Sequence, residues 1–256
     1  MMIFLELLGI FLIFTAGACF YSFLNIVIYR LPRGISILKE RNQCMACGHV
    51  LTVDDLIPVV SWLQLGGRCR YCDTVIPARY SRVELLGGVT ALVSVFRLGW
   101  TLRACLMYAF LAVLTVTGLT EWDTGKIPDV LLKLITVLAV LQLLLLNQQQ
   151  YLAYIAGCLC ISLPLSGVKL RIPAAFTAQE IILMAVCGLF TGWRVMLVSF
   201  TFAVFCGGIY ALKKMLGDDE QKKKNFLYGP FLCIGVYFGQ MFGEPLIRGY
   251  LSFFGL

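Results

Sequence analysis

The sequence predicts an all-α polytopic membrane protein of about eight transmembrane helices, with one small polar loop domain between the first two. Of its 256 residues, 60% are hydrophobic and only 14% are charged, whereas soluble domains carry about 25% charged residues. The mean hydropathy is +0.86. The apolar residues form long runs rather than short periodic stripes, which favours spanning helices over a soluble core.

The apolar runs divide the chain into three parts: a first transmembrane helix (1–29), a polar domain (30–82) and a membrane domain of about seven helices (83–256). The first run is too long for the core of a secretory signal and lacks a clear cleavage site, so we expect a retained helix. The eight candidate spans cover approximately residues 3–28, 83–99, 103–120, 129–147, 151–168, 177–192, 194–212 and 227–245.

The distribution of positive charge predicts the orientation of these spans. Lys and Arg crowd the polar domain, which is therefore expected on the cytoplasmic side. Alternation through the spans then places Thr120–Asp129 and Gln179-Glu180 on that same side. The net charge of +7 is spread over separate loops, so it indicates topology, with contact to anionic lipid as a secondary use, and no nucleic-acid partner.

Four cysteines in the polar domain have the spacing of a metal site. They form two Cys-x-x-Cys pairs, Cys44/Cys47 and Cys69/Cys72, typical of a four-thiolate zinc centre. Four thiolates close the coordination sphere, so this zinc would be structural. Two accidental pairs or a redox site are the alternatives. The single histidine, His49, is expected as a solvated or outer-sphere group rather than a ligand, and it leaves no Ser/His/Asp triad.

Carboxylates at the ends of spans are the second candidate site, because acids there are costly. Glu121 lies in the stretch T-E-W-D-T-G-K-I-P-D (120–129), and Glu180 in the first turn of the sixth span. If these two meet, they would share a proton and could divide base and acid roles in hydrolysis. Acids solvated by loops, or an ion pathway, are the alternatives. Glu6 and Glu244 are interpreted as interfacial acids.

Several ordered motifs resemble those of bacterial type IV prepilin peptidases, a family of GxGD-type aspartic proteases that also carry N-methyltransferase activity. They span nearly the whole chain: F-Y-S-F-L-N-I-V-I-Y-R-L-P-R (20–33), both cysteine pairs, L-I-P-V-V-S-W-L (56–63), G-G-R-C-R-Y-C (66–72), Y-S-R-V-E-L-L (80–86), I-P-D (127–129), G-L-F-T-G-W (188–193) and G-P-F-L (229–232).

The resemblance assigns site residues, with one departure. Counted back from Ile127-Pro128, the family's first catalytic aspartate corresponds to Glu121, and Asp123 takes the place of a companion acid that we expect at the substrate. Asp123 is also the rival for the first catalytic role. The second aspartate corresponds to Glu180, where the family's G-x-G-D reads T-A-Q-E. Both aspartates are therefore glutamates, consistent with a site rebuilt around glutamate, an altered site, or a relative that has lost proteolysis.

The resemblance further implies the reaction and its setting. The chain would cleave the leader of type IV prepilins or pseudopilins at the cytoplasmic face of the bacterial inner membrane, then methylate the new N-terminus with S-adenosylmethionine. Loop acids Asp54, Asp55 and Asp73 could attract the basic leader or be merely solvated. The alternatives are a membrane protein that binds prepilins without cutting, a chain that only methylates, and a transporter.

Overall fold

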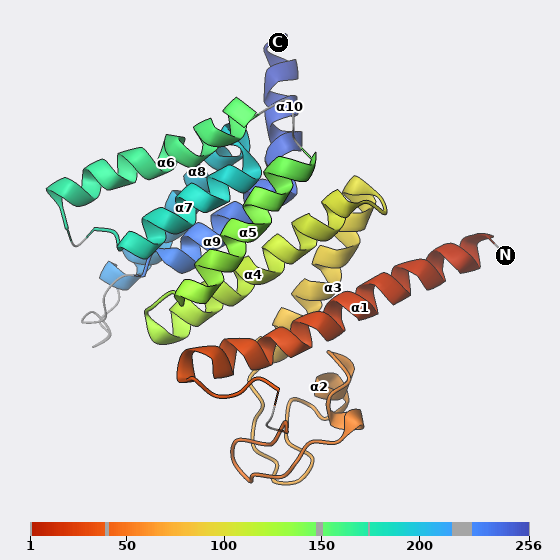
Figure 1. Cartoon of the computed structure of the whole chain (residues 1–256). Helices are drawn as coiled ribbons and strands as arrows, with labels where there is room; N and C mark the ends of the chain where they lie inside the picture. The colour runs from red at the N-terminus through yellow and green to blue at the C-terminus, as the bar shows by residue number, and fades with distance from the viewer. Residues whose placement is uncertain (1, 39–40, 147–150, 174, 217–226, 256) are drawn as a thin grey trace. The chain divides into compact units, whose positions relative to one another are not determined.

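The computed structural model describes residues 2–38, 41–146, 151–173, 175–216 and 227–255 (Figure 1). These residues are mostly helical and contain no strand beyond two isolated bridges. They form two compact units, Met1–Tyr108 and Ala109–Leu256. Helix α4 (Leu102–Thr124) begins in the first unit and continues into the second.

The first unit holds two long helices and the polar loop between them. Its elements are α1 (Met2–Arg30), η1 (Leu31–Arg33), η2 (Val53–Asp55), α2 (Val60–Gln64) and α3 (Arg79–Leu98). Small residues let α1 and α3 approach closely: Gly17 packs against Gly87 and Ala91, where any added β-carbon would overlap the neighbouring helix. Such contacts are typical of helices packed in lipid.

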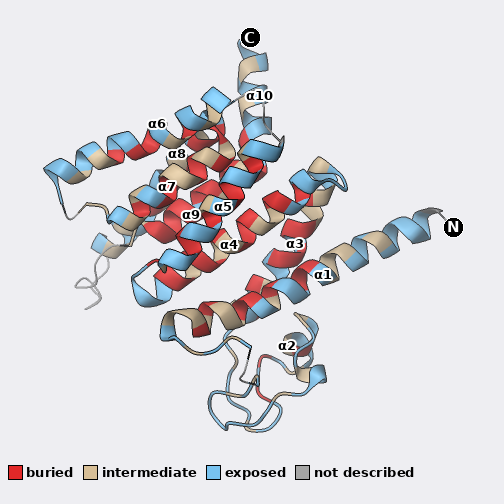
Figure 2. Ribbon diagram, in the orientation of Figure 1, coloured by how far each residue is buried: buried red, intermediate tan, exposed pale blue. Residues whose placement is uncertain are grey.

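The second unit is a bundle of apolar helices. After α4 come α5 (Asp129–Leu146), α6 (Tyr151–Arg171), α7 (Ala178–Thr191), α8 (Trp193–Leu216), α9 (Gly229–Phe238), the π-helical segment η4 (Gly239–Gly243) and α10 (Glu244–Phe253). Glycines again mark the closest contacts, Gly157 against Gly188 between α6 and α7. Phe110 of α4 stacks on Phe190 of α7 with ring centroids 3.9 Å apart. The core of this unit therefore surrounds α4 and α7 (Figure 2).

The helices agree with the predicted all-α membrane fold. Four described helices are long and apolar enough to cross a bilayer: α1, α4, α6 and α8; the shorter α7 is also apolar. Each predicted span falls on a helix, but the last one, predicted to end near residue 245, continues through η4 and α10 to Phe253. The glycine-rich stretch 239–243 keeps its helical path by widening the turn rather than ending the helix.

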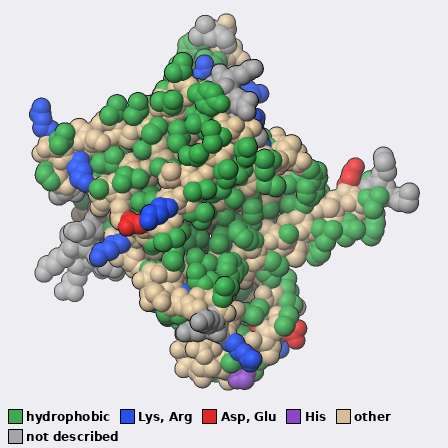
Figure 3. All heavy atoms as spheres, in the orientation of Figure 1, with side chains coloured by type: hydrophobic (Ala, Val, Ile, Leu, Met, Phe, Trp, Pro, Cys, Tyr) green, Lys and Arg blue, Asp and Glu red, His purple; other side chains and the backbone are tan. Residues whose placement is uncertain are grey.

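Large apolar side chains remain exposed along the helices, as a lipid-facing surface requires. Leu7 of α1, Leu163 of α6 and Phe205 of α8 are 60%, 61% and 64% exposed. Figure 3 shows apolar side chains over much of the visible face, with few charges among them. Soluble monomers rarely expose so large an apolar surface, whereas a lipid bilayer can cover it.

Candidate active site and metal centre

The four predicted cysteine ligands come together in the polar loop. They lie on two similar turns, Cys44–Gly48 and Cys69–Asp73. In each turn the first cysteine donates its N–H across the turn, Cys44 to the His49 carbonyl and Cys69 to the Thr74 carbonyl, both at 2.9 Å. A left-handed residue closes each turn, Gly48 at φ +71° and Asp73 at φ +58°. Both Cys-x-x-Cys pairs are thus presented by the same local geometry.

The donor set fits zinc. The four sulfur atoms of Cys44, Cys47, Cys69 and Cys72 lie within 4.8 Å of one another, and Cys44 Sγ is 3.8 Å from Cys72 Sγ. Tetrahedral thiolates at about 2.3 Å from zinc are about 3.8 Å apart. Backbone N–H groups of Cys47 and Ala46 lower the pKa of the Cys44 thiol to about 6. The His49 backbone lowers the pKa of Cys47, but burial and the Cys44 and Cys72 thiols outweigh it and raise that pKa to about 11. No fifth group is needed, so such a zinc is structural.

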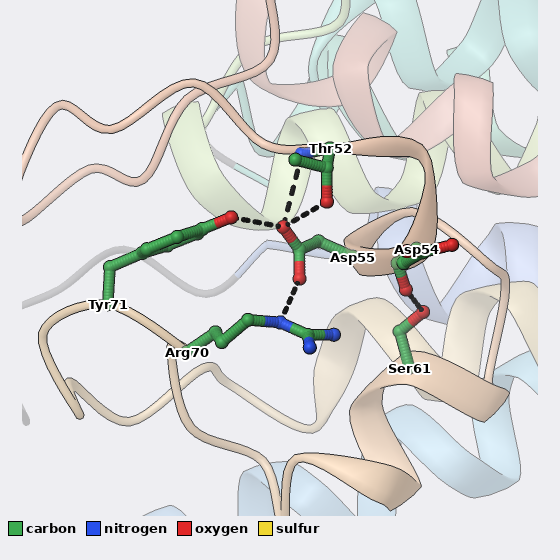
Figure 4. Close-up of polar contacts among 6 residues, drawn as sticks. All are labelled: Thr52, Asp54, Asp55, Ser61, Arg70 and Tyr71. Atoms are coloured by element: carbon green, nitrogen blue, oxygen red, sulfur yellow. Dashed lines mark hydrogen bonds and ion pairs between the residues drawn. The ribbon is translucent and has the colours of Figure 1, made fainter.

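Thr74 contacts one of the sulfurs, with its Oγ1 3.3 Å from Cys72 Sγ, whereas other polar side chains of the loop contact one another. His49 stacks on Tyr71, with ring centroids 3.6 Å apart, and it is not among the clustered donors. Figure 4 shows Asp55 between Arg70 and Thr52: its Oδ1 accepts from Arg70 Nε at 2.8 Å and its Oδ2 from Thr52 Oγ1 at 2.8 Å. Asp73 pairs with Arg68 at 2.9 Å. The two loop acids Asp55 and Asp73 are thus paired with arginines.

Glu180 is a buried acid at the start of α7. It is 3% exposed and forms a capping box with Thr177, whose N–H and Oγ1 donate to Oε2 at 2.7 and 2.9 Å. The other oxygen, Oε1, accepts from the backbone N–H groups of Tyr228 and Gly229 at 3.1 and 3.0 Å. Those two groups belong to the N-terminus of α9, whose first N–H groups lack partners within the helix. Four donors therefore occupy the four lone-pair positions of this carboxylate.

Glu121 lies against the same helix start. It is 2% exposed on the last turns of α4, and its carboxylate fills the space that a β-carbon would take at Gly229. Its Oε2 atom is buried and has no hydrogen-bond partner among the described residues. The structure thus brings Glu121 and Glu180, 59 positions apart in sequence, into contact with the same glycine.

A second contact fixes α4 against α9 below this point. Gly118 of α4 faces Cys233 of α9, and a β-carbon at Gly118 would lie only 3.0 Å from that of Cys233. Gly118 precedes Glu121 by about one helical turn, and Cys233 follows Gly229 by about one turn. The two helices therefore touch at two levels. The glycine belongs to α9 at the level of Glu121 and to α4 at the level of Cys233.

Asp123 does not share the buried position that Glu121 and Glu180 occupy. It is exposed on the last turn of α4, whereas Glu121 two residues earlier is buried. Another acid links the two motifs instead: Asp129, at the start of α5, accepts a hydrogen bond from Gln179 Nε2 at 3.1 Å. The I-P-D and T-A-Q-E stretches are thus joined directly at the entrances of α5 and α7.

Sequence reasoning missed the contacts of four residues at this site. Tyr228 and Gly229 contribute backbone N–H groups, and a backbone contact cannot be predicted from the type of residue. Gln179 was noticed only as a polar residue beside Glu180. For Thr177 the signal was available, since Thr followed three residues later by Glu at a helix start is the pattern of a capping box.

The apolar helices, the four-cysteine cluster and the two buried glutamates together describe a polytopic helical membrane protein with a metal-type loop and a candidate acid-pair site. Sequence comparison is consistent with that class: residues 15–98 match the bacterial peptidase A24 N-terminal domain. In these comparisons the chain is similar to prepilin leader peptidases.

Relatives over the full length have the same family name. The prepilin leader peptidase/N-methyltransferase of Aeromonas salmonicida is 28% identical, covering 94% of this chain and 93% of the relative. That of Bacillus subtilis is 26% identical, covering 94% and 97%. A higher identity, 42%, is confined to a stretch shared with the Myxococcus xanthus protein that covers 46% of this chain and 36% of the relative. No solved structure matches the chain.

Proposed function

We propose that this chain cleaves the leader of type IV prepilins or pseudopilins at the cytoplasmic face of the inner membrane and methylates the new N-terminus. The names of the full-length relatives support the reaction. The observation that carries the site is the convergence of Glu121 and Glu180 on Gly229. Two buried acids of different helices facing one peptide unit are the arrangement that proton-sharing hydrolysis needs.

The contacts of the two acids divide their roles. A proton on the Glu180 carboxylate would displace one of the four hydrogen-bond donors around it. Glu180 is therefore assigned as the ionised partner, which keeps α7 and the start of α9 in place. Glu121 has the open oxygen, Oε2, and is assigned as the group that contacts the attacking water. Substrate entry must release at least one hydrogen bond of Glu180 before that residue can take part in proton transfer.

In the hydrolytic step the glutamate pair holds one shared proton, which points to the scissile carbonyl oxygen. The water oxygen attacks the carbonyl carbon, and a proton of that water passes to the pair. Collapse of the tetrahedral intermediate breaks the C–N bond, and the pair returns a proton to the leaving amine. The released amine is the acceptor for methylation, for which S-adenosylmethionine is the methyl donor that the family resemblance implies; no residue is assigned to hold it.

The zinc loop has a structural part in this proposal. Its four thiolates fit a closed zinc site, and because Asp55 and Asp73 pair with arginines, Asp54 is the one of the three loop acids for which no ion pair with an arginine is described. We therefore assign substrate contact to the membrane helices, with Asp123 at the exposed end of α4 as the acid nearest in sequence to the pair.

A cleavage assay with purified full-length protein and a purified prepilin tests this function. We expect the unaltered chain to cut, Glu121→Gln and Glu180→Gln each to lose about 10²-fold or more in kcat/KM, and Asp123→Asn to keep most of the catalytic rate while weakening substrate binding. If the unaltered chain cuts nothing while Glu121→Asp/Glu180→Asp cuts well, glutamate is not the active form of the pair. If neither cuts but prepilin still binds, the chain is a binding protein.

A further inference from the structure

The polar loop presents an apolar face to its surroundings. Val60 and Leu63 lie three residues apart on one side of α2 and are 44% and 64% exposed. Ile57, just before α2, is 44% exposed. The stretch 56–67 contains no charged residue. We call Ile57, Val60 and Leu63 the α2 face.

The opposite side of α2 is fixed to the loop, so the α2 face cannot turn inward. Ser61 Oγ donates to the Asp54 carbonyl at 2.7 Å (Figure 4). Trp62 Nε1 donates to the Ile76 carbonyl at 3.0 Å, and its ring packs over Gly67. The exposed apolar side chains are therefore a stable feature of the folded loop.

A half-buried acid, Glu84, links this segment to the long helices. Glu84 of α3 accepts from the Val59 N–H at 2.8 Å through Oε2 and from Ser22 Oγ of α1 at 2.7 Å through Oε1. Val59 itself has φ +64° and ψ −47°, and the Val60 N–H reaches back to the Pro58 carbonyl at 2.7 Å. This is a γ-turn of the strained type, unusual for a β-branched residue, and Glu84 holds it in place.

The hydrogen bonds of Glu84 with Val59 and Ser22, here called the tether, set the level of the α2 face along α1. Ser22 precedes Arg30 by eight residues, or about 12 Å along the helix axis. Helix α1 is apolar and long enough to cross a bilayer, and its charged end begins at Arg30. Glu84 thus bonds the Val59 turn to a level inside the apolar part of α1, not to the polar region beyond its end. In Figure 1 the loop turns back from the end of α1 toward α2.

We propose that the α2 face docks into the bilayer surface, as an interfacial anchor that holds the zinc loop against the membrane. The occupant is lipid because the tether places the face at a depth where α1 itself contacts lipid. Uncharged, apolar side chains at that level gain by entering the headgroup–acyl boundary. Of the flanking charges, Asp55 pairs with Arg70 and Arg68 with Asp73, and the exposed Asp54 precedes the uncharged stretch, so it lies outside the α2 face.

Site-specific photocrosslinking of the full-length protein tests the anchor. A photoreactive amino acid replaces Leu63, and in a matched protein it replaces Val75, which belongs to the same loop and is 66% exposed. Both proteins are reconstituted into vesicles of phosphatidylethanolamine and phosphatidylglycerol, irradiated and analysed by mass spectrometry. Thermal melting shows beforehand that both fold like the unaltered chain.

We expect lipid adducts at position 63 to exceed those at position 75 several-fold. Equal lipid labelling at the two positions would overturn the proposal. So would labelling at position 63 that goes instead to another part of the chain or, when a prepilin is added, to the prepilin. The measurement needs no catalytic turnover, so its outcome is separate from that of the cleavage assay.

Discussion

The backbone N–H of Gly229 lies 3.0 Å from Glu180 Oε1, while the Glu121 carboxylate occupies the space beside the α-carbon of the same glycine. One residue without a side chain therefore contacts two acids that come from α4 and α7. This relationship makes the start of α9 a part of the site and gives the first prediction.

Gly229→Ala should lower cleavage of a prepilin by about 10²-fold, because its β-carbon displaces the Glu121 carboxylate by roughly an ångström. The kinetic assay on purified protein measures this as a loss in kcat. Gly208→Ala on α8 is the matched control, since a β-carbon there meets nothing within 4 Å. Full activity of Gly229→Ala would show that the carboxylates are not held as described.

Glu180→Gln and Glu121→Gln should differ in stability. The amide nitrogen of glutamine cannot accept hydrogen bonds, so Glu180→Gln leaves backbone donors of Thr177 or of the α9 start unpaired, at a cost of about 1–3 kcal/mol. Glu121 Oε2 has no described partner to lose, so Glu121→Gln should be close to neutral. Thermal unfolding in one detergent compares the two proteins. A smaller effect for Glu180→Gln than for Glu121→Gln would contradict the assigned contacts.

Removal of one sulfur ligand should release zinc and loosen the loop. We expect about one zinc per chain in protein purified under reducing conditions and a much lower content in Cys69→Ser, because structural zinc sites use all four ligands. Cys105→Ser, at an exposed cysteine outside the cluster, is the control and should keep its zinc. Elemental analysis decides the point, and zinc-free unaltered protein would refute the four-thiolate site.

The Asp55 contacts predict a pH dependence of the loop. Burial alone would raise the pKa of Asp55, but hydrogen bonds from the Thr52 side chain and backbone and from Arg70 lower it from 3.8 to about 2. Because the folded pKa is depressed, ionised Asp55 stabilises the loop fully above about pH 4. That contribution is lost as the pH falls through 2.

The difference in unfolding free energy between the unaltered chain and Asp55→Asn should therefore shrink between pH 4 and 2. Using this difference cancels acid effects common to both proteins, including those on the cysteines. Asp73→Asn, at the exposed pair with Arg68, should change stability little at any pH, since exposed ion pairs contribute little. A gap for Asp55→Asn that stays constant with pH would contradict the lowered pKa.

The helices and the acid pair could be predicted because both leave marks in residue type. Apolar runs located the long helices, though not α2 or α10, and the acids at the ends of spans stood out against them. The continuation to Phe253 was missed because glycines and a proline near 243–245 resemble a helix end, yet a π-turn absorbs them. The four donors of Glu180 were missed because three of them are main-chain N–H groups. The fold-back of the loop onto α1 depends on Glu84, whose partners are distant in sequence.

The two levels at which α4 touches α9 restrict which substitutions this chain can accept during evolution. At one level the glycine is Gly229 and faces Glu121; at the other it is Gly118 and faces Cys233. Any larger residue at either glycine must be matched by a smaller one on the facing helix. Across relatives, Gly118 with Cys233 and Gly229 with Glu121 are therefore expected to vary as pairs, and the glutamate at position 121 should be inherited together with the packing that admits it.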